Sequence, residues 1–360
     1  MSFSLESVES YLCDRILPCA NSIDQDVAAL QAAFQALGHQ GWLGLRILAK
    51  WGGNQVSTYE FQQFQEAIAR YSGALAFLQA QHQSAGAFLS RSENEELQYR
   101  YLPHMTTGAI AVGVGFSHLR RPGTPLLKAL PVDGGYHIHG TIPWITGFGV
   151  FQWFIGAAVL PSDRALYGMF PFIEHQSCGE GKLQFSPPMA LAAMTSTNTV
   201  TATFNHWFLP HSQVLFTTPA DAIHTNDVQN VLQHSFHALG CARAGLDVVA
   251  KAAKTRPLVQ PTFVALDQEL LNCRQLIYQA QSQPFEDRLT LRAWAIELAV
   301  RCAHAAITVS SGAANLLDHV AQRIYREALV FTVAGQTPAV MAATLKRLVR
   351  NRGEELDLTD

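Results

Sequence analysis

Apolar residues recur every three or four positions along the first part of the chain, as they do on one side of a helix. Two series show this spacing: Leu5, Val8 and Leu12, and then Val27, Leu30, Phe34 and Leu37. Gly38 and Gly41 follow the second series, where a helix is expected to end, and Ser57 or Thr58 can cap a later one. The pattern predicts an α-helical N-terminal domain over residues 1–108.

From residue 109 the helical period gives way to alternation, β-branched and aromatic residues, and Gly and Pro punctuation. Strands are expected over 110–116, 133–147, 151–160, 165–173 and 199–204. Such a pattern is typical of mainly β structure. We therefore predict a central β-domain over residues 109–216.

Helical spacing returns after residue 216 and continues to the end of the chain. One helix is expected around Leu232–Val249, and others over about 262–281, 286–312 and 337–352. The third domain, residues 217–360, is predicted to be α-helical. The fold class is thus α+β, mostly α, in the order helices, strands, helices.

Composition supports a folded globular protein, because 48% of the 360 residues are hydrophobic and 15% are charged. So few charges suggest that other subunits cover part of the surface, although a large core would give the same composition. The formal net charge of −3 gives no electrostatic attraction to nucleic acid or to an anionic membrane. We therefore expect neither as a partner.

The cysteines and the N-terminus indicate a reducing, cytoplasmic location. The six cysteines contain no CxxC pair: Cys13, Cys19, Cys178, Cys241, Cys273 and Cys302. The N-terminus has neither a basic region nor the apolar stretch of a secretory leader, and no apolar run reaches membrane-spanning length. Free thiols are expected.

The segment Asp133–Gly147 combines turn, strand and aromatic signals. It opens on a Gly-Gly pair, alternates as a strand, is expected to turn again at Gly140, and then reads Trp144-Ile145-Thr146. This pattern predicts a hairpin that presents an aromatic ring and a hydroxyl group at one place.

This hairpin resembles the "dGdgyvlnGeKtWiTn" segment of the acyl-CoA dehydrogenase family. Other segments resemble family elements in the same order: residues 42–53, 95–103, 204–215 and 238–247. The resemblance implies a three-domain fold, with an N-terminal helical domain, a central β-barrel or sandwich and a C-terminal four-helix bundle. It implies an oxidoreductase activity on a small molecule such as an acyl-CoA, and FAD as cofactor. It also implies a homodimer or homotetramer that assembles through the bundle.

The resemblance further implies that FAD binds between the β-domain and the bundle, with Trp144 packed against the flavin ring and Thr146 near its N5 atom. It places cofactor contacts at Val112, Val114, Trp144, Ile145, Thr146, Arg256, Gly312 and Thr337. The chain departs from the family in two of these elements. The family's Thr-Glu-Pro and Gly-Ser-Asp triplets are absent around residues 113–123, and no Phe-Gly follows Arg256.

The catalytic base of the family has no counterpart at its usual position. Dehydrogenation next to a thioester needs a base for the α-proton, and in the family this is a Glu in a "yRda.i..i.EGt" motif. Here Gly335 takes that position, and Asp227 is the only carboxylate candidate near the alternative position of the base. Three hypotheses remain: a dehydrogenase with another base, a flavin-dependent monooxygenase that needs no such base, and a non-catalytic homologue.

Two histidine pairs and one arginine pair have open alternatives. His137 and His139 face one side of a strand and could ligate a metal, or could simply be solvated or packed. His234 and His237 lie one helical turn apart, and either could donate a proton to substrate. Arg120 with Arg121 could meet a phosphate or a carboxylate, or be an exposed basic pair.

Overall fold

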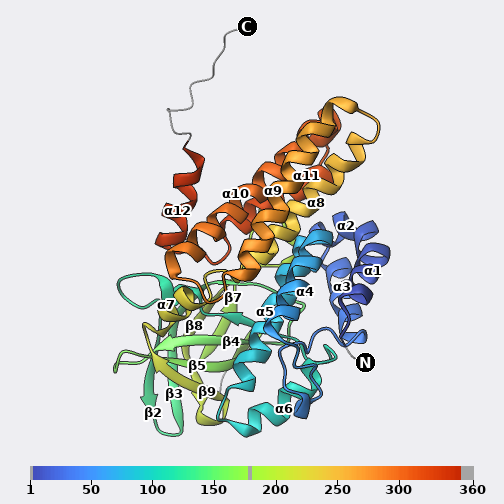
Figure 1. The fold of residues 1–360 in the computed structure, drawn as a ribbon. Helices are drawn as coiled ribbons and strands as arrows, with labels where there is room; N and C mark the ends of the chain where they lie inside the picture. Colours follow the sequence, from blue (N-terminus) through green and yellow to red (C-terminus); the bar gives the residue numbers. More distant parts are fainter. Residues whose placement is uncertain (1–2, 177–180, 350–360) are drawn as a thin grey trace. The chain divides into compact units, whose positions relative to one another are not determined.

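The computed structural model describes residues 3–176 and 181–349, so Cys178 and the predicted helix end at Arg352 lie outside the described residues. Contacts divide the chain into two compact units, Met1–Val228 and Gln229–Asp360. Figure 1 shows helices, a sheet and further helices in that order along the sequence. The α+β fold class is therefore confirmed. The boundaries of the three predicted domains stay a prediction.

The first unit begins with helices, among them the two, α1 and α3, that the apolar series at Leu5 and Val27 predicted. Their bounds are α1 Leu5–Tyr11, α2 Ala20–Gln25, α3 Val27–His39, α4 Thr58–Tyr71, α5 Gly73–Ser90 and α6 Glu95–Met105. Ser57 is the N-cap of α4: its hydroxyl accepts a hydrogen bond from the Glu60 amide at 3.2 Å, and the Glu60 carboxylate accepts one from the Ser57 amide at 2.8 Å. This reciprocal capping satisfies two amides that the helix itself leaves unpaired.

In the described residues, the β-region is one sheet of nine strands. Their bounds are β1 Val112–Gly115, β2 Leu127–Val132, β3 Gly135–Ile145, β4 Trp153–Val159, β5 Arg164–Pro171, β6 His175–Gln176, β7 Lys182–Phe185, β8 Val200–Pro210 and β9 Val214–Pro219. The order is β6-β7-β8-β3-β2-β4-β5-β9, and β1 pairs in parallel with β4. The helix α7, Ala222–Gln229, follows β9.

The predicted second turn at Gly140 is wrong. Strand β3 runs without interruption through Gly140, and its hairpin partner is β2, with Val132 opposite Gly135. Gly140 has φ +122° and lies so close to Leu126 that an added Cβ would be 2.1 Å from that residue's carbonyl oxygen. Glycine is therefore needed for a bulge inside the strand, because a side chain there would collide with the neighbouring backbone.

A buried core joins α5 and α6 to the sheet. It contains Leu89 from α5, Tyr101 from α6, Val112 from β1 and Ile155 from β4. The apolar faces that the sequence pattern predicted meet here, because each element buries the side on which its apolar residues recur. Strand β1 is fixed by this core.

The second unit is helical. Its helices are α8 Ser235–Ala253, α9 Gln260–Gln279, α10 Phe285–Ser310, α11 Val320–Val333 and α12 Pro338–Leu348. Helices α8 to α11 pack together as a bundle, and α12, which covers most of the helix predicted over 337–352, lies against α10. The sequence pattern predicted α8, α9, α10 and α12, whereas α11 was noticed only as a motif.

Candidate functional site

Trp144 is turned outward at the end of β3 by a β-bulge. Ile142 pairs with Ala202 and Ile145 with Val200, so three steps along β3 match two along β8. The extra residue changes which side chains face the core, because side chains alternate along a strand. As a result the Trp144 side chain is 47% exposed, whereas Ile142 and Ile145 are buried.

Thr146 follows the bulge but points inward. Its hydroxyl and that of Thr199 lie 3.1 Å apart in a hydrogen bond, and the residue is buried. Strand β1 comes close to the same segment, because a Cβ on Gly115 would lie 2.8 Å from Cγ1 of Ile145. The structure thus brings β1 together with the segment 144–146.

Val112 and Val114 on β1 pack into the core that joins the helices to the sheet. The Val112 amide donates a hydrogen bond to Nδ1 of His82 at 3.1 Å, and Nε2 of His82 donates one to the Met105 carbonyl at 2.9 Å. Burial lowers the pKa of His82 to about 4, so the ring is neutral near pH 7. The side chains of both valines belong to this core, and their predicted cofactor contact stays a prediction.

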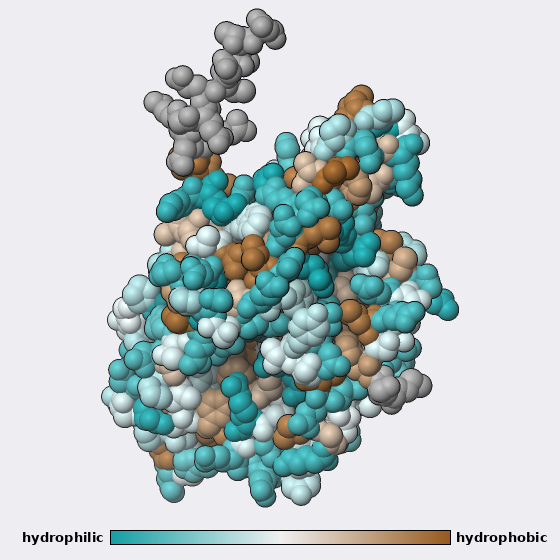
Figure 2. Space-filling model, viewed as in Figure 1, coloured by the Kyte–Doolittle hydropathy of each residue, from teal (hydrophilic) through white to brown (hydrophobic). Residues whose placement is uncertain are grey.

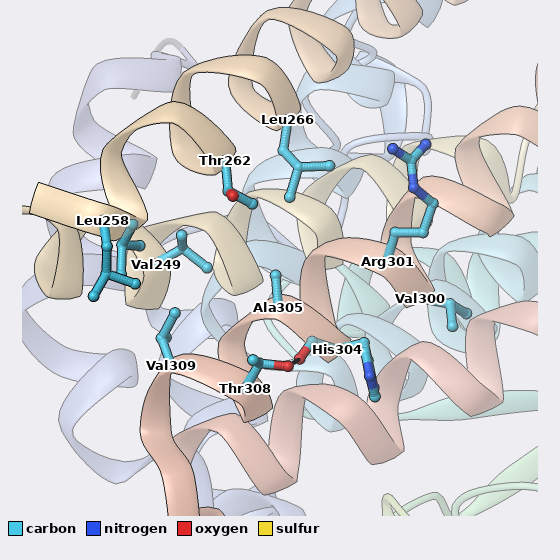
Figure 3. Close-up of a pocket in the computed structure, with 11 residues that line it drawn as sticks. Val249, Leu258, Thr262, Leu266, Val300, Arg301, His304, Ala305, Thr308 and Val309 are labelled. Carbon is cyan, nitrogen blue, oxygen red and sulfur yellow. Dashed lines mark hydrogen bonds between the residues drawn. The ribbon is translucent and has the colours of Figure 1, made fainter. Parts of the chain in front are cut away.

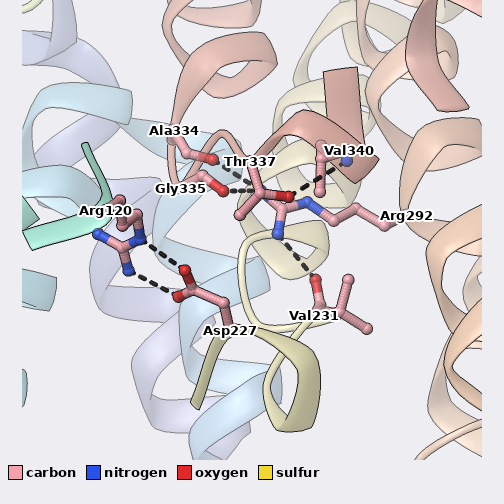
Figure 4. A network of polar contacts seen from close by, with 8 residues as sticks. All are labelled: Arg120, Asp227, Val231, Arg292, Ala334, Gly335, Thr337 and Val340. Carbon is pink, nitrogen blue, oxygen red and sulfur yellow. Dashed lines mark hydrogen bonds and ion pairs between the residues drawn. The ribbon is translucent and has the colours of Figure 1, made fainter. Parts of the chain in front are cut away.

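The carboxylate candidate Asp227 is held by an arginine of its own unit. Nε and Nη2 of Arg120 each donate a hydrogen bond of 2.7 Å to one oxygen of Asp227, as Figure 4 shows. Arg120 and Arg121 were expected either to bind a phosphate or carboxylate or to be an exposed pair. The structure divides them, because Arg120 binds a carboxylate and Arg121 is exposed. To act as a base, Asp227 would have to give up part of a charge-assisted, bidentate pair.

Gly335, where the family's Glu was expected, lies in the turn between α11 and α12 with φ +60°. A Cβ at this position would be 2.5 Å from Nε2 of His234. Thr337, two residues on, caps α12 by accepting a hydrogen bond from the Val340 amide at 3.2 Å. Both the backbone and the neighbouring imidazole therefore disfavour any side chain at position 335.

Arg292 on α10 fixes this turn. Its guanidinium is buried and donates to three carbonyls, those of Val231 at 3.0 Å, Ala334 at 2.8 Å and Gly335 at 2.9 Å (Figure 4). Arginine suits this task because its planar head carries several donors in fixed directions. No sequence motif indicated Arg292, since its partners are backbone atoms far away in the chain.

A buried ion pair lies within the bundle. Arg323 and Glu327 on α11 are 2.7 Å apart, and their side chains are 1% and 0% exposed. Burial and the Glu327 charge raise the pKa of the Cys241 thiol well above its usual value. Nearby, His237 stacks on Phe331, and burial lowers the pKa of His237 to about 4. The four-residue spacing of Arg323 and Glu327 was the one signal in the sequence for this pair.

Arg256 and Gly312 are exposed at the turns that follow α8 and α10. Between these helices and α9 lies a largely apolar groove of about 570 Å³. Figure 3 shows its lining, in which Leu258 and Val309 lie at one end and Arg301 at the other. The groove therefore runs from the neighbourhood of Arg256 and Gly312 along the bundle, and their cofactor contacts stay a prediction.

Comparison with known proteins agrees with this architecture. The sequence profile of the acyl-CoA dehydrogenase N-terminal domain matches residues 4–109. An acyl-CoA dehydrogenase of Bacillus subtilis is 21% identical over 352 residues, which cover 90% of each chain. A 3-(aryl)acrylate reductase of Clostridium sporogenes is 21% identical over 354 residues, which cover 90% of this chain and 92% of the reductase.

The chain belongs to the acyl-CoA dehydrogenase family. The fold agrees as well: the butyryl-CoA dehydrogenase of Megasphaera elsdenii superposes with a TM-score of 0.78, 16% identity, and coverage of 97% of this chain and 100% of that one. The predicted family membership is therefore confirmed, and with it an oxidoreductase family of the acyl-CoA dehydrogenase type.

The two histidines of β3, His137 and His139, lie near a third histidine, His206 on β8. The rings of His139 and His206 are 4.9 Å apart, and those of His137 and His206 are 6.3 Å apart. Across the part of the chain that the structure describes, no three His, Cys, Asp or Glu residues are arranged to hold a metal ion. Nor does any described helix have the length and apolar character needed to cross a membrane.

The surface at Trp144 fits a flavin in part. A half-exposed indole offers an apolar face for a planar ring, and the neighbouring main chain of β3 offers polar groups at its edge. The Thr146 hydroxyl is already hydrogen-bonded to Thr199, so it keeps only its remaining bonding capacity for a ligand. These residues would hold the ring by stacking more than by side-chain hydrogen bonds.

Proposed function

We propose that this protein is a flavin-dependent oxidoreductase that acts on the CH–CH group of an acyl thioester or a related small molecule. The observation that carries the proposal is the outward turn of Trp144. A bulge that exposes a large aromatic side chain costs buried apolar area, so it is best explained by a ligand that covers the ring. Bound FAD would supply the hydride acceptor.

The residues of this chain would then divide the work as follows. Trp144 would stack on the ring, and Ile145 and Thr146 would hold the strand end in place through the core and Thr199. The core around Val112 would keep β1 beside them. An acyl-CoA is the substrate class that family membership favours.

A second copy of the chain is the partner that we propose for the bundle. Helix α11 exposes apolar side chains at four-residue spacing, and α12 does so at similar spacing: Tyr325, Leu329 and Val333, and then Met341, Leu345 and Leu348. Figure 2 shows apolar surface, in brown, over helices of this unit. Burial of such stripes against another subunit would remove them from water.

A monooxygenase of the same fold is the second candidate. It is favoured because neither of the two positions at which the family resemblance led us to expect a carboxylate base offers a free carboxylate. Gly335 has no side chain, and both oxygens of Asp227 are bound by Arg120. Oxygenation of a substrate would not need a base for an α-proton, so neither feature would hinder it.

The visible absorption spectrum of the purified protein, titrated with FAD, tests the proposal. We expect stoichiometric binding, and we expect Trp144→Ala to weaken it about tenfold or more, because stacking on an aromatic ring is lost. Tyr59→Ala, which removes another exposed aromatic side chain of the first unit, is the matched control. If Trp144→Ala and the wild type bind FAD with equal affinity, Trp144 does not contact the flavin and the observation that carries the proposal is lost.

Anaerobic addition of acyl-CoA thioesters separates the two reactions. Bleaching of the bound flavin by a thioester supports oxidation of the CH–CH group. Flavin that no thioester bleaches, but that consumes oxygen once chemically reduced and transfers it to a substrate, supports the monooxygenase. A protein that binds no flavin under any condition would contradict both.

A further inference from the structure

The imidazole of His234 occupies the space into which a side chain at position 335 would project. A Cβ on Gly335 would be 2.4 Å from Cδ2 and 2.5 Å from Nε2 of His234. Heavy atoms that are not bonded do not approach this closely. The ring of His234 therefore fills the place where a carboxylate on residue 335 would begin.

The backbone segment that carries this ring is held by buried hydrogen bonds. His234 is the N-cap residue of α8, and the Val231 carbonyl three residues earlier is bound by Arg292. The same guanidinium binds the carbonyl of Gly335 at 2.9 Å. Arg292 thereby ties the segment that carries His234 to the turn that carries Gly335, so the contact between these two residues is part of the fold.

His234 is half-buried, whereas His237 one turn later is buried. Two ionisable side chains lie near His234. Arg292 from α10 has its Nη2 3.3 Å from the Cβ that would be added to Gly335, and His237 from α8 has its ring centre 6.2 Å from that of His234. His237 is buried against Phe331, and burial lowers its pKa to about 4. Of the two imidazoles, His234 is thus the one that a substrate could reach.

Imidazole is suited to the chemistry that a carboxylate would otherwise perform. A group that takes up and releases a proton near neutral pH can serve both directions of a reaction, and a histidine side chain ordinarily titrates in this range. Neither Gly335 nor the ion-paired Asp227 offers such a group without rearrangement.

We propose that His234 is the residue that transfers the substrate's α-proton, in place of the missing carboxylate; this rests on the proposed oxidation of a CH–CH group. In oxidation the Cα–H bond breaks, Nε2 takes the proton, and the electron pair forms the C=C bond. Bound FAD would supply the acceptor for the hydride of the β-carbon, and with it the two-electron oxidant that the step needs. In the reverse direction the imidazolium returns the proton to Cα.

The proton step can be tested separately from the hydride step. The purified protein is incubated in D₂O with each acyl-CoA thioester, without an electron acceptor, and deuterium at Cα is followed by mass spectrometry. We expect the wild type to exchange this hydrogen and His234→Gln to do so about 100-fold or more slowly, because general base catalysis contributes roughly 10²–10⁴-fold. His39→Gln, which changes an exposed histidine on α3, should exchange as the wild type does.

Gly335→Ala gives a second, independent variant. Its methyl group must displace the imidazole, so exchange should slow although the histidine is still present. Circular dichroism and the FAD titration would show whether both variants remain folded and bind flavin as before.

The outcomes distinguish this proposal from the proposed function. Slow exchange in both variants with unchanged flavin binding supports His234. Exchange and bleaching at the wild-type rate in His234→Gln would overturn the role of His234 and leave the oxidation of the thioester intact. A wild type that neither exchanges the α-hydrogen nor is bleached by any thioester would overturn both.

Discussion

Arg120 and Asp227 stand 107 positions apart in the sequence, yet two hydrogen bonds of 2.7 Å join them. Arg120 ends the short 3₁₀ turn after β1, and Asp227 lies on α7, near the end of the first unit. The pair therefore fastens α7 to the sheet region. The same contact that stabilises this helix keeps the carboxylate occupied.

Loss of this pair should destabilise the first unit. Arg120→Ala leaves a partly buried carboxylate without its partner, and we expect a cost of about 2 kcal/mol. Thermal unfolding of the variant should therefore begin at a lower temperature than that of Arg121→Ala, which removes the exposed neighbour. The double variant Arg120→Ala/Asp227→Asn should recover part of the loss. If both single arginine variants melt alike, the pair contributes nothing measurable.

His82 should make the stability of the first unit depend on pH. Its pKa is about 4 in the folded chain, because of burial, and near 6.5 when exposed. The unfolded chain thus binds the proton first, so the free energy of unfolding should fall as pH drops from about 6.5 to 4, by roughly 3 kcal/mol for this group. Urea midpoints measured between pH 7 and 4.5 check this.

His82→Gln should be less stable at pH 7 but should lose less stability on acidification. The glutamine lacks a group that titrates, although it cannot replace both hydrogen bonds of the ring. His104→Gln, an exposed histidine of the same unit, should follow the wild type at every pH. Parallel curves for wild type and His82→Gln would show that His82 does not set this pH dependence.

Arg292 should govern the attachment of α12. In Arg292→Lys the charge remains, but one ammonium group cannot reach all three carbonyls in the geometry of a guanidinium. We expect amide hydrogen exchange in residues 334–348 to accelerate about tenfold or more, as measured by mass spectrometry. Lys346→Ala, an exposed change on α12 itself, should leave the exchange almost unaltered. Equal exchange in the two variants would contradict the role of Arg292.

The described cysteines should divide sharply in reactivity towards iodoacetamide. All five are free thiols: Cys13 and Cys19 are exposed, and Cys241, Cys273 and Cys302 are buried. Burial also raises the pKa of Cys273 and Cys302 to about 12, so little thiolate forms at pH 8. Peptide mapping after brief labelling should find the first two modified and the other three intact. Rapid modification of Cys302 in the folded protein would contradict the buried bundle core.

The sequence predicted those elements whose side chains repeat with the period of their structure. The apolar series at Leu5 and Val27 became helices, and Ser57 became a cap, because local spacing and local hydrogen bonding determine such features. Strand β2 was missed because Lys128 and Pro131 weaken its strand pattern. Pairing with β3 supplies what its own sequence lacks.

The site was less predictable, because its contacts join distant parts of the chain. The motif comparison located Gly335 but did not explain why a glycine occupies this position. The structure offers a reason: the ring of His234, about a hundred residues earlier in the chain, lies where a Cβ would be. The bulge that exposes Trp144 depends on the register with β8, and a single strand's sequence does not contain that register. The three hydrogen bonds that Arg292 makes to the Gly335 turn and to Val231 go to carbonyl groups, which every residue has.

The contact between Gly335 and His234 also limits how this protein could change. A carboxylate introduced at position 335 would meet a backbone with φ +60° and an imidazole already in its path, so the substitution would weaken the fold before it could help catalysis. Removing His234 first would clear the path but would leave the position with no proton-transferring group. A carboxylate at position 335 therefore requires two replacements together, one at each end of this contact.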